Sequence, residues 1–346
     1  MIFPIRSELG TSRPSSWKRT TREIGEGQCR RVIIRTMKTN PLWRSLRFVG
    51  IFCLFIGATG FAQDAGWEHE LAAWRTQHVA ELLKPAGWLS LTGLEWLRDG
   101  DNSFGTADDN NIHLAGSGPG HMGILRLAGS NVQLLPPRGG FPPDLLVAGA
   151  AAKPQVLLVD PDNDKNAPHI TIGTLNMYVI RRGERYALRV KDSKSQTLVG
   201  FRGLNWYAPN MKYRVKAKWI PYNPPKSVTL ATLAGTTYSQ PVPGAAEFVL
   251  DAKTYRLEPV LEDPAAQQLF FILRDTTSSK TTYHACRFLY TVLPTHGLDK
   301  PGELVLDLNR LENPPCAYTA FATCPLPPPQ NRLAIALPVG EKRYHD

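Results

Sequence analysis

Residues 174–190 read TLNMYVIRRGERYALRV, and the pattern of this stretch decides the fold class of the chain. Two short apolar runs, Thr174–Ile180 and Tyr186–Val190, are separated by a polar segment that contains Gly183. Short runs rich in β-branched, aromatic and aliphatic residues and bounded by turn-forming residues are typical of β-strands. We therefore expect two strands here.

Similar runs recur on both sides of this stretch, each bounded by Gly, Pro, Asn or Asp. They include Ile124–Ala128, Val132–Leu135, Val156–Val159, Ala246–Leu250, Leu269–Leu273, Leu304–Leu306 and Leu333–Leu337. They do not alternate with segments of helical period, as the strands of a parallel α/β sheet would. The sequence predicts a mainly β fold with antiparallel, sandwich-like or barrel-like sheets.

One amphipathic helix is predicted near the N-terminal end, at Gln63–Lys84. Trp67, Leu71 and Trp74 begin an apolar stripe at three- and four-residue spacing, and Pro85 ends the pattern. His78 lies on the same stripe. We interpret it as a hydrogen-bonded core histidine rather than a ligand-binding one.

The first 62 residues are expected to be absent from the working protein. Positive residues from Lys38 to Arg47 precede the apolar run Phe48–Gly60 and a small-residue cleavage site after Ala62. This order is typical of a secretory signal peptide, here residues 37–62, with an uncleaved anchor as the alternative. We interpret residues 1–36 as a non-native upstream extension, with a disordered cytosolic tail as the alternative.

Removal of this leader changes the charge of the chain. The formal net charge is +10, but residues 1–62 hold 11 Lys/Arg and three Asp/Glu, so the remainder carries only +2. Nothing then favours a nucleic-acid partner. We expect a periplasmic or extracellular protein with no stable membrane span after cleavage; its oligomeric state stays open.

Three cysteines remain after the leader, and at most two can pair within the chain. Cys316 and Cys324 bracket a short Pro-bounded loop, so we expect a disulfide between them in an oxidising compartment. Cys286 stands in a strand-like run and is expected to be a buried free thiol. The chain has no C-x-x-C and no His pair at zinc spacing, so no metal and no cofactor are predicted.

The stretch WIPYNPP at Trp219–Pro225 is the best interior boundary. We predict an N-terminal helix and β domain at 63–222 and a C-terminal β region at 223–346. The sequence lacks the nucleophile elbow, phosphate-binding loop, dinucleotide fingerprint and H-E-x-x-H motif. Common hydrolases, NTPases and dehydrogenases are therefore disfavoured.

The polar residues that could carry chemistry lie between residues 269 and 342. Two apolar runs end at Asp275 and Asp307, and the segment Asn313–Arg332 is rich in proline. Prolines fix φ and remove backbone donors, so this segment is rigid and short of hydrogen-bond partners. Asn and Asp side chains beside it could supply those bonds, or could hold a small polar ligand.

Residues 307–342, DLNRLENPPCAYTAFATCPLPPPQNRLAIALPVGEK, resemble the C-terminal signature of the bacterial and archaeal family catalogued as domain of unknown function 1684. The resemblance extends upstream to Asp275, to Thr282–Leu289 and to GWLSLTGLEWL at Gly87–Leu97. The family shows glycine, an aromatic, tyrosine, glutamate and alanine or glycine where this chain has Ser279, Leu308, Glu312, Gln330 and Val339. The changes at Glu312 and Gln330 put in doubt any role that rests on those side chains. The family has no established activity.

We take binding of a small polar or anionic ligand as the expected function. Arg287 would anchor a carboxylate or phosphate, and the other predicted ligand-binding residues are Asn309, Asn313, Asn331 and Glu341.

Two alternatives stay open. In a hydrolytic enzyme, Asp275 and Asp307 would be general acid and base, while Tyr283 and Arg287 stabilise developing charge. In a purely structural cluster, Asp307 and the Asn residues cap turns and Arg287 pairs with Asp275 or Asp307.

Overall fold

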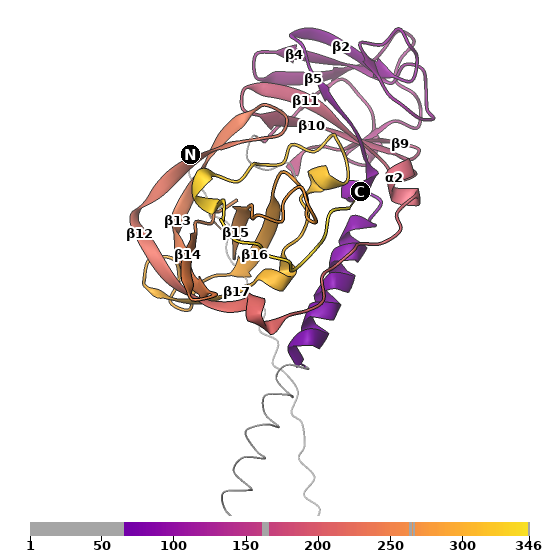
Figure 1. Ribbon diagram of the computed structural model, residues 1–346. Coiled ribbons are helices and arrows are strands. Elements are labelled where there is room, and N and C mark those ends of the chain that lie inside the picture. The colour runs from indigo at the N-terminus through magenta and orange to yellow at the C-terminus, as the bar shows by residue number, and fades with distance from the viewer. Residues whose placement is uncertain (1–65, 161–165, 263–264, 266, 345–346) are drawn as a thin grey trace, which may run out of the picture. The chain divides into compact units, whose positions relative to one another are not determined.

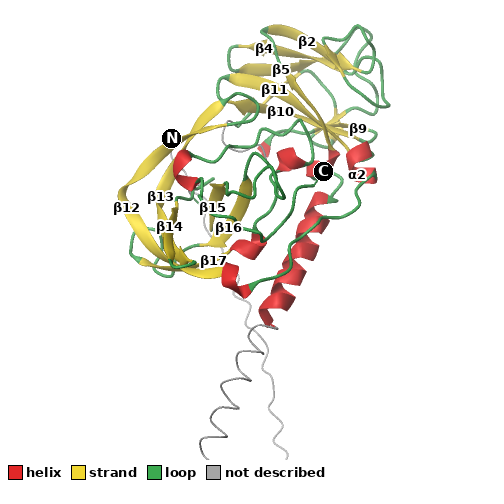
Figure 2. Ribbon diagram, in the orientation of Figure 1, coloured by secondary structure: helices red, strands yellow, loops and turns green. Residues whose placement is uncertain are grey.

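The computed structural model describes residues 66–160, 166–262, 265 and 267–344. The leader, the signal peptide and the upstream extension that we predict therefore lie outside the described residues. The described chain is mainly β, as predicted, with several antiparallel sheets and few helices (Figures 1 and 2). The sheets of the described residues do not close into a barrel.

The predicted amphipathic helix is confirmed over residues 66–82. Its stripe buries Trp67, Leu71 and Leu82, which are 6%, 0% and 4% exposed. After it, the chain turns back at Gly87, where a Cβ atom would lie 2.7 Å from the Leu82 carbonyl oxygen. No helix in the described part of the chain is long and apolar enough to cross a membrane.

Two sheets form the N-terminal β sandwich. One has the order β3 (Ile112–His113), β2 (Gly100–Gly105), β4 (Gly123–Ala128), β5 (Asn131–Leu135), β8 (Gln155–Leu157). The other has the order β1 (Leu91–Trp96), β11 (Arg185–Asp192), β10 (Leu175–Arg182), β9 (Ile170–Ile172), β6 (Leu146–Val147), β7 (Ala150–Ala151). Alternate residues of both sheets meet in one apolar core, with Phe104 and Leu125 from the first and Met177 and Leu188 from the second.

The stretch quoted at the outset forms the β10–β11 hairpin in this second sheet. Its antiparallel register runs from Leu175 opposite Asp192 to Arg182 opposite Arg185. Gly183 in the turn has a φ of 59°, a left-handed conformation that glycine adopts without steric cost. The turn residue and the two apolar runs thus agree in specifying the hairpin.

The C-terminal region is built on a second antiparallel system. A four-stranded sheet has the order β14 (Lys253–Leu257), β13 (Thr237–Leu250), β12 (Arg214–Ala231), β17 (Gly302–Asp307), and a separate pair is formed by β15 (Gln268–Leu273) and β16 (Arg287–Val292). The core between them contains Trp219, Phe248, Phe271 and Leu289. The short helices are η2 (Trp88–Ser90), α2 (Gln196–Val199), η4 (Met211–Tyr213), η5 (Leu308–Arg310), η6 (Pro315–Ala317) and η7 (Pro329–Asn331).

One segment differs from the sequence prediction. Leu333–Leu337 is not a strand, because its backbone groups bond to the segment around Asp275 and not to a neighbouring strand. Leu337 N–H donates to the Asp275 carboxylate, and the Ile335 carbonyl accepts from Thr276 N–H. The domain division near residue 223 stays a prediction; the residue lies in β12, which runs from Arg214 to Ala231.

Candidate functional site

Asp275 and Arg287 form a buried ion pair at the ends of β15 and β16. Nη1 of Arg287 donates to Oδ2 of Asp275 over 3.2 Å, and both side chains are 0% exposed. Oδ1 of Asp275 accepts from the backbone and hydroxyl of Thr277 at 2.8 and 2.6 Å, and from Leu337 N–H at 3.1 Å. Burial lowers the pKa of Arg287, and the Asp275 carboxylate opposes this shift. Both oxygens of the Asp275 carboxylate thus accept hydrogen bonds from the protein itself.

Both terminal nitrogens of Arg287 also hold the C-terminal segment in place. Nη1 also donates to the Leu337 carbonyl at 3.0 Å, and Nη2 donates to the carbonyl of Val339. Gly340, with a φ of 77°, follows at a point where a Cβ would lie 2.8 Å from Nη2 of Arg287. Arg287 is therefore a structural crosslink that leaves no exposed face for a ligand.

Asp307 and Asn309 lie at the end of β17 and fasten two distant segments. Oδ2 of Asp307 accepts from the Trp67 indole at 2.7 Å, and its Oδ1 accepts from the Asn309 side chain at 2.9 Å. The Asn309 amide also bonds both backbone groups of Asn210, at 2.9 and 3.1 Å. These residues cap turns and join the 66–82 helix to the C-terminal region.

Glu341 and Asn313 form a third buried group. Oε1 of Glu341 accepts from the Asn313 amide at 2.6 Å and from the Tyr318 hydroxyl at 2.7 Å, while Oε2 accepts from Asn313 N–H at 2.9 Å. Asn331 acts in the same way elsewhere: its amide bonds Glu258 N–H and the carbonyls of Glu258 and Ile272. All three are less than 3% exposed.

His78 completes this network from the helix. Its Nδ1 lies 3.2 Å from Oε2 of Glu312, and its Nε2 lies 3.5 Å from Oε2 of Glu341. The ring stacks on Trp74 with centroids 5.5 Å apart. Burial disfavours the charged imidazole, but the two carboxylates outweigh it and raise the pKa of His78 to about 10. Glu312, a position where the chain departs from the family pattern, thus has a partner of its own.

The two cysteines of the Pro-bounded loop are neighbours and carry free thiols in the structure. The Cys316 N–H donates to Sγ of Cys324 at 3.2 Å. Tyr283, the third catalytic candidate, donates its hydroxyl to the Cys316 carbonyl at 2.9 Å. Burial, followed by the neighbouring Cys316, raises the pKa of Tyr283 well above its usual value. A disulfide between Cys316 and Cys324 stays a prediction.

The predicted site residues therefore divide into separate buried groups. Asp275 and Asp307 belong to different hydrogen-bond networks. The oxygens of both carboxylates accept hydrogen bonds from other groups of the protein. Neither side chain lines either of two surface hollows among the described residues. This geometry does not favour acid–base catalysis by the pair.

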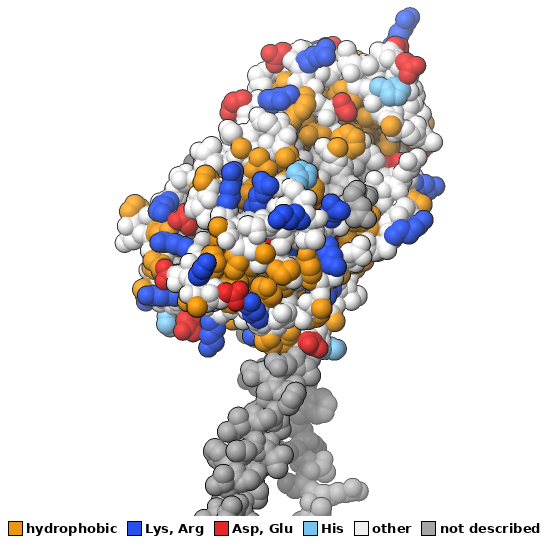
Figure 3. Space-filling model, viewed as in Figure 1, with side chains coloured by type: hydrophobic (Ala, Val, Ile, Leu, Met, Phe, Trp, Pro, Cys, Tyr) orange, Lys and Arg blue, Asp and Glu red, His pale blue; other side chains and the backbone are white. Residues whose placement is uncertain are grey.

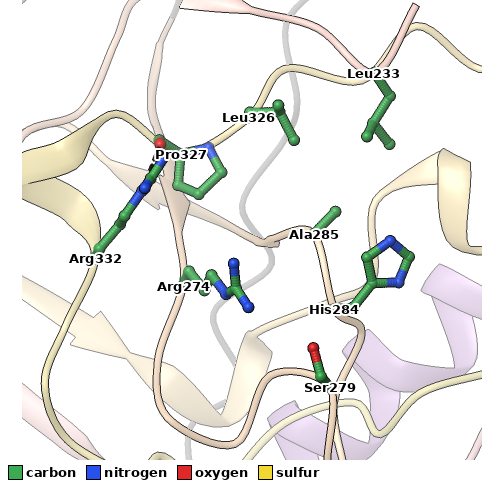
Figure 4. A pocket seen from close by; sticks show the side chains of 8 residues that line it. All are labelled: Leu233, Arg274, Ser279, His284, Ala285, Leu326, Pro327 and Arg332. Carbon is green, nitrogen blue, oxygen red and sulfur yellow. Dashed lines mark hydrogen bonds between the residues drawn. The ribbon is translucent and has the colours of Figure 1, made fainter.

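One of these hollows collects exposed cationic side chains instead. It has a volume of about 250 Å³ and lies between the loop after β15 and the Pro-rich segment. Figure 4 shows Arg332, Pro327 and Arg274 toward one side of the hollow, with Ser279 and His284 toward the other; the remaining lining residues are Leu233, Ala285 and Leu326. Arg274, Ser279, His284 and Arg332 are exposed. The hollow is open to solutes.

Backbone bonds hold the two arginines of this hollow side by side. Arg274 N–H donates to the Asn331 carbonyl at 3.1 Å, and the Arg274 carbonyl accepts from Leu333 N–H at 2.7 Å. Nε of Arg332 bonds the Pro327 carbonyl at 3.4 Å. No Asp or Glu lines the hollow, and no described carboxylate forms an ion pair with either arginine. Figure 3 shows Lys and Arg side chains gathered near a His side chain on the face of the molecule that it presents.

Arg274, His284 and Arg332 were not singled out from the sequence, although a signal exists. Arg274 directly precedes Asp275 in extended chain, so the two side chains point to opposite sides. Burial of one therefore implies exposure of the other. Nothing in the sequence indicates that Arg332 would lie next to Arg274, because this depends on the path of the Pro-rich segment. Among the described residues, no group of three or more His, Cys, Asp or Glu side chains could hold a metal ion.

Comparison with known proteins gives a family but no activity. Residues 199–342 match the model of a family described as a protein of unknown function, DUF1684. The match does not reach Gly87–Leu97, where we also see a resemblance. No curated protein matches the chain. An uncharacterized protein of Haloarcula marismortui, solved by NMR, is 28% identical over 42% of this chain and 78% of its own, with a TM-score of 0.36.

Substitution of Arg287 tests the structural role of the buried ion pair. We expect Arg287→Ala to lower the free energy of unfolding by about 3–5 kcal/mol, because it leaves the Asp275 carboxylate buried without a cation. Arg274→Ala, at the exposed end of the adjoining strand, is the matched control and should change it by less than about 0.5 kcal/mol. Chemical denaturation measures both. Equal stability of the two variants would contradict the assignment.

His78 predicts a pH dependence of stability. The ordinary pKa of histidine is about 6.5, and the pKa of His78 in the folded protein is about 10. Its stabilising effect is therefore complete below pH 6.5 and is lost as the pH rises through 10. We expect the stability difference between wild type and His78→Gln to be larger at pH 6 than at pH 10, measured by urea unfolding. A constant difference would show that His78 does not carry this charge.

Proposed function

Through residues 199–342 the chain belongs to the DUF1684 family, and we propose that this region binds a small anion in the hollow between Arg274 and Arg332. The observation that carries the proposal is the pair of exposed arginines lining one hollow that contains no carboxylate. The proposed ligand is a small anion, which agrees with the ligand class expected from the sequence. The anchoring residues are Arg274 and Arg332 in place of the buried Arg287.

The chemistry of the lining supports an anion. A guanidinium offers several N–H donors in a planar fork, and this fork matches the oxygens of a carboxylate or phosphate. An anion bound between two such groups would offset the repulsion between their charges. Ser279 and His284 add a hydroxyl and a ring nitrogen at the same rim. The exposed position allows the ligand to exchange with solvent.

The rigid surroundings also favour binding. Pro327 and Pro328 restrict the backbone on one side of the hollow, and η7 follows directly. Asn331, which we expected to contact ligand, fixes this segment to Glu258, the residue after β14, and to Ile272 of β15 through three hydrogen bonds. An anion would therefore bind without first ordering the loop, which reduces the entropic cost of binding.

We further propose that the protein works after export, in the periplasm or outside the cell. The support is the signal-peptide pattern at 37–62, together with the near-neutral charge of the remainder. In that compartment, Cys316 and Cys324 would be oxidised to a disulfide. Such a short closed loop would stabilise the Pro-rich wall of the hollow by about 2–3 kcal/mol.

Binding of inorganic phosphate tests the anion site. We expect wild type to bind it, Arg274→Ala and Arg332→Ala each to weaken binding about tenfold, and the double variant to abolish it, because each loses a charged hydrogen-bond donor. Isothermal titration calorimetry measures this. Arg214→Ala, an exposed arginine on β12 outside the lining, is the matched control. Undiminished binding in the double variant, or no binding by wild type, would refute the site.

Thiol counting tests the predicted disulfide. Protein purified from an oxidising compartment, then denatured without reductant, should show one alkylated cysteine by mass spectrometry. That cysteine should be Cys286, which is 0% exposed in the fold and has no neighbour left to pair with. Reduction before alkylation should release two more. Three reactive thiols without reductant would exclude the Cys316–Cys324 bond.

A further inference from the structure

A second hollow adjoins the anion site. It has a volume of about 340 Å³ and is lined by Ser279, Thr282, Tyr283, His284, Ala317, Arg343 and Tyr344. Ser279 and His284 also line the first hollow, so the two lie on either side of the turn that carries these residues. A ligand that passes over this turn would reach both.

The lining of the second hollow differs in character from that of the first. Tyr283 and His284 present rings with centroids 4.5 Å apart, inclined by 51°. Tyr344 adds a third ring, which is held edge-on against Tyr318 at 5.0 Å. The hydroxyl of Tyr283 is already bonded to the Cys316 carbonyl. The lining thus combines three rings with Arg343 and the smaller residues Ser279, Thr282 and Ala317. The rings favour an aromatic partner through stacked or edge-to-face contacts.

We propose that the ligand of this protein is an aryl-bearing anion, with its acid group between Arg274 and Arg332 and its ring in the second hollow. This inference rests on the anion site proposed above and extends it to a ligand class. The first hollow, at about 250 Å³, is smaller than the range usual for small-molecule sites, and the second lies at the lower end of that range. A compound with two parts uses both.

The turn between the hollows is built to hold its shape. Ser279 has a φ of 68°, a left-handed conformation that a non-glycine residue rarely adopts. Hydrogen bonds from Ser279 N–H to Thr282 and from Ser278 N–H to Asp275, both 3.2 Å, maintain it. Strained residues of this kind persist where the surrounding structure fixes them, and they cluster at ligand clamps. In Figure 4 the Ser279 hydroxyl points into the space beside Arg274.

The position of this turn depends on the buried ion pair. Thr277, two residues before Ser279, donates both its N–H and its hydroxyl to Asp275. The carbonyl of Thr277 accepts from the N–H groups of Lys280 and Thr281, each at 3.0 Å. Asp275 and Arg287 are thus positioning residues for the boundary between the hollows. Because the ion pair is buried, the turn between the hollows stays fixed. The acid group of the ligand would lie on one side of this turn and its ring on the other.

Three probes test the inference by calorimetry on the full protein: inorganic phosphate, methyl phosphate and phenyl phosphate. We expect wild type to bind phenyl phosphate at least tenfold more tightly than methyl phosphate. Tyr344→Ala should reduce this preference to less than threefold while it leaves the affinity for inorganic phosphate unchanged. Tyr255→Ala, a half-buried tyrosine on β14 outside both hollows, is the matched control and should keep the full preference.

The outcomes separate the two proposals. Binding of inorganic phosphate with equal affinity for methyl and phenyl phosphate would overturn the aryl inference and leave the anion site intact. Absence of binding for all three probes would overturn both. If Tyr344→Ala fails to fold, as judged by its unfolding transition, Ala317→Leu adds bulk to the same hollow and should likewise remove the preference. Retention of the tenfold preference in a folded variant would refute the assignment.

Discussion

The buried ion pair between Asp275 and Arg287 is the constraint on which the C-terminal region depends. Two charges removed from water cost several kcal/mol each unless they meet each other and further hydrogen-bonding groups. Here the carboxylate accepts three additional donors, and the guanidinium donates to carbonyls of the last described segment. That segment forms no strand, and its backbone contacts are isolated, such as the bridge between Glu341 and Trp206. The ion pair therefore adds to these few backbone contacts in holding the segment.

The same device is repeated at Asp307 and at Glu341. Each is a buried carboxylate whose oxygens are occupied by protein donors, and each joins elements far apart in the sequence. In consequence the polar signature of the C-terminal region serves mainly to assemble the fold. The groups that can contact a solute are side chains next to these buried carboxylates that point outward because the backbone is extended. Arg274 is the clearest example.

The mainly β class, the N-terminal helix and most strands could be predicted from sequence, because each depends on local periodicity and turn residues. The β10–β11 hairpin is the clearest case. The irregular path of Leu333–Leu337 could not be predicted. Its apolar alternation is typical of a strand, but its backbone groups bond to Asp275 and Thr276 and not to a neighbouring strand. For the same reason, the sequence identified which polar residues matter without showing that they are buried. The proximity of Arg274 and Arg332 depends on tertiary contacts that no local pattern encodes.

The bond from Trp67 to Asp307 joins residues 240 positions apart. His78 likewise finds its carboxylates at Glu312 and Glu341. During synthesis the helix therefore emerges long before its binding surface exists, and its tryptophan-lined stripe stays without a partner for most of that time. Contacts of such long sequence separation slow folding and prolong the exposure of apolar surface. The helix can therefore gain these native contacts only after the segment from Asp307 to Glu341 has been synthesised.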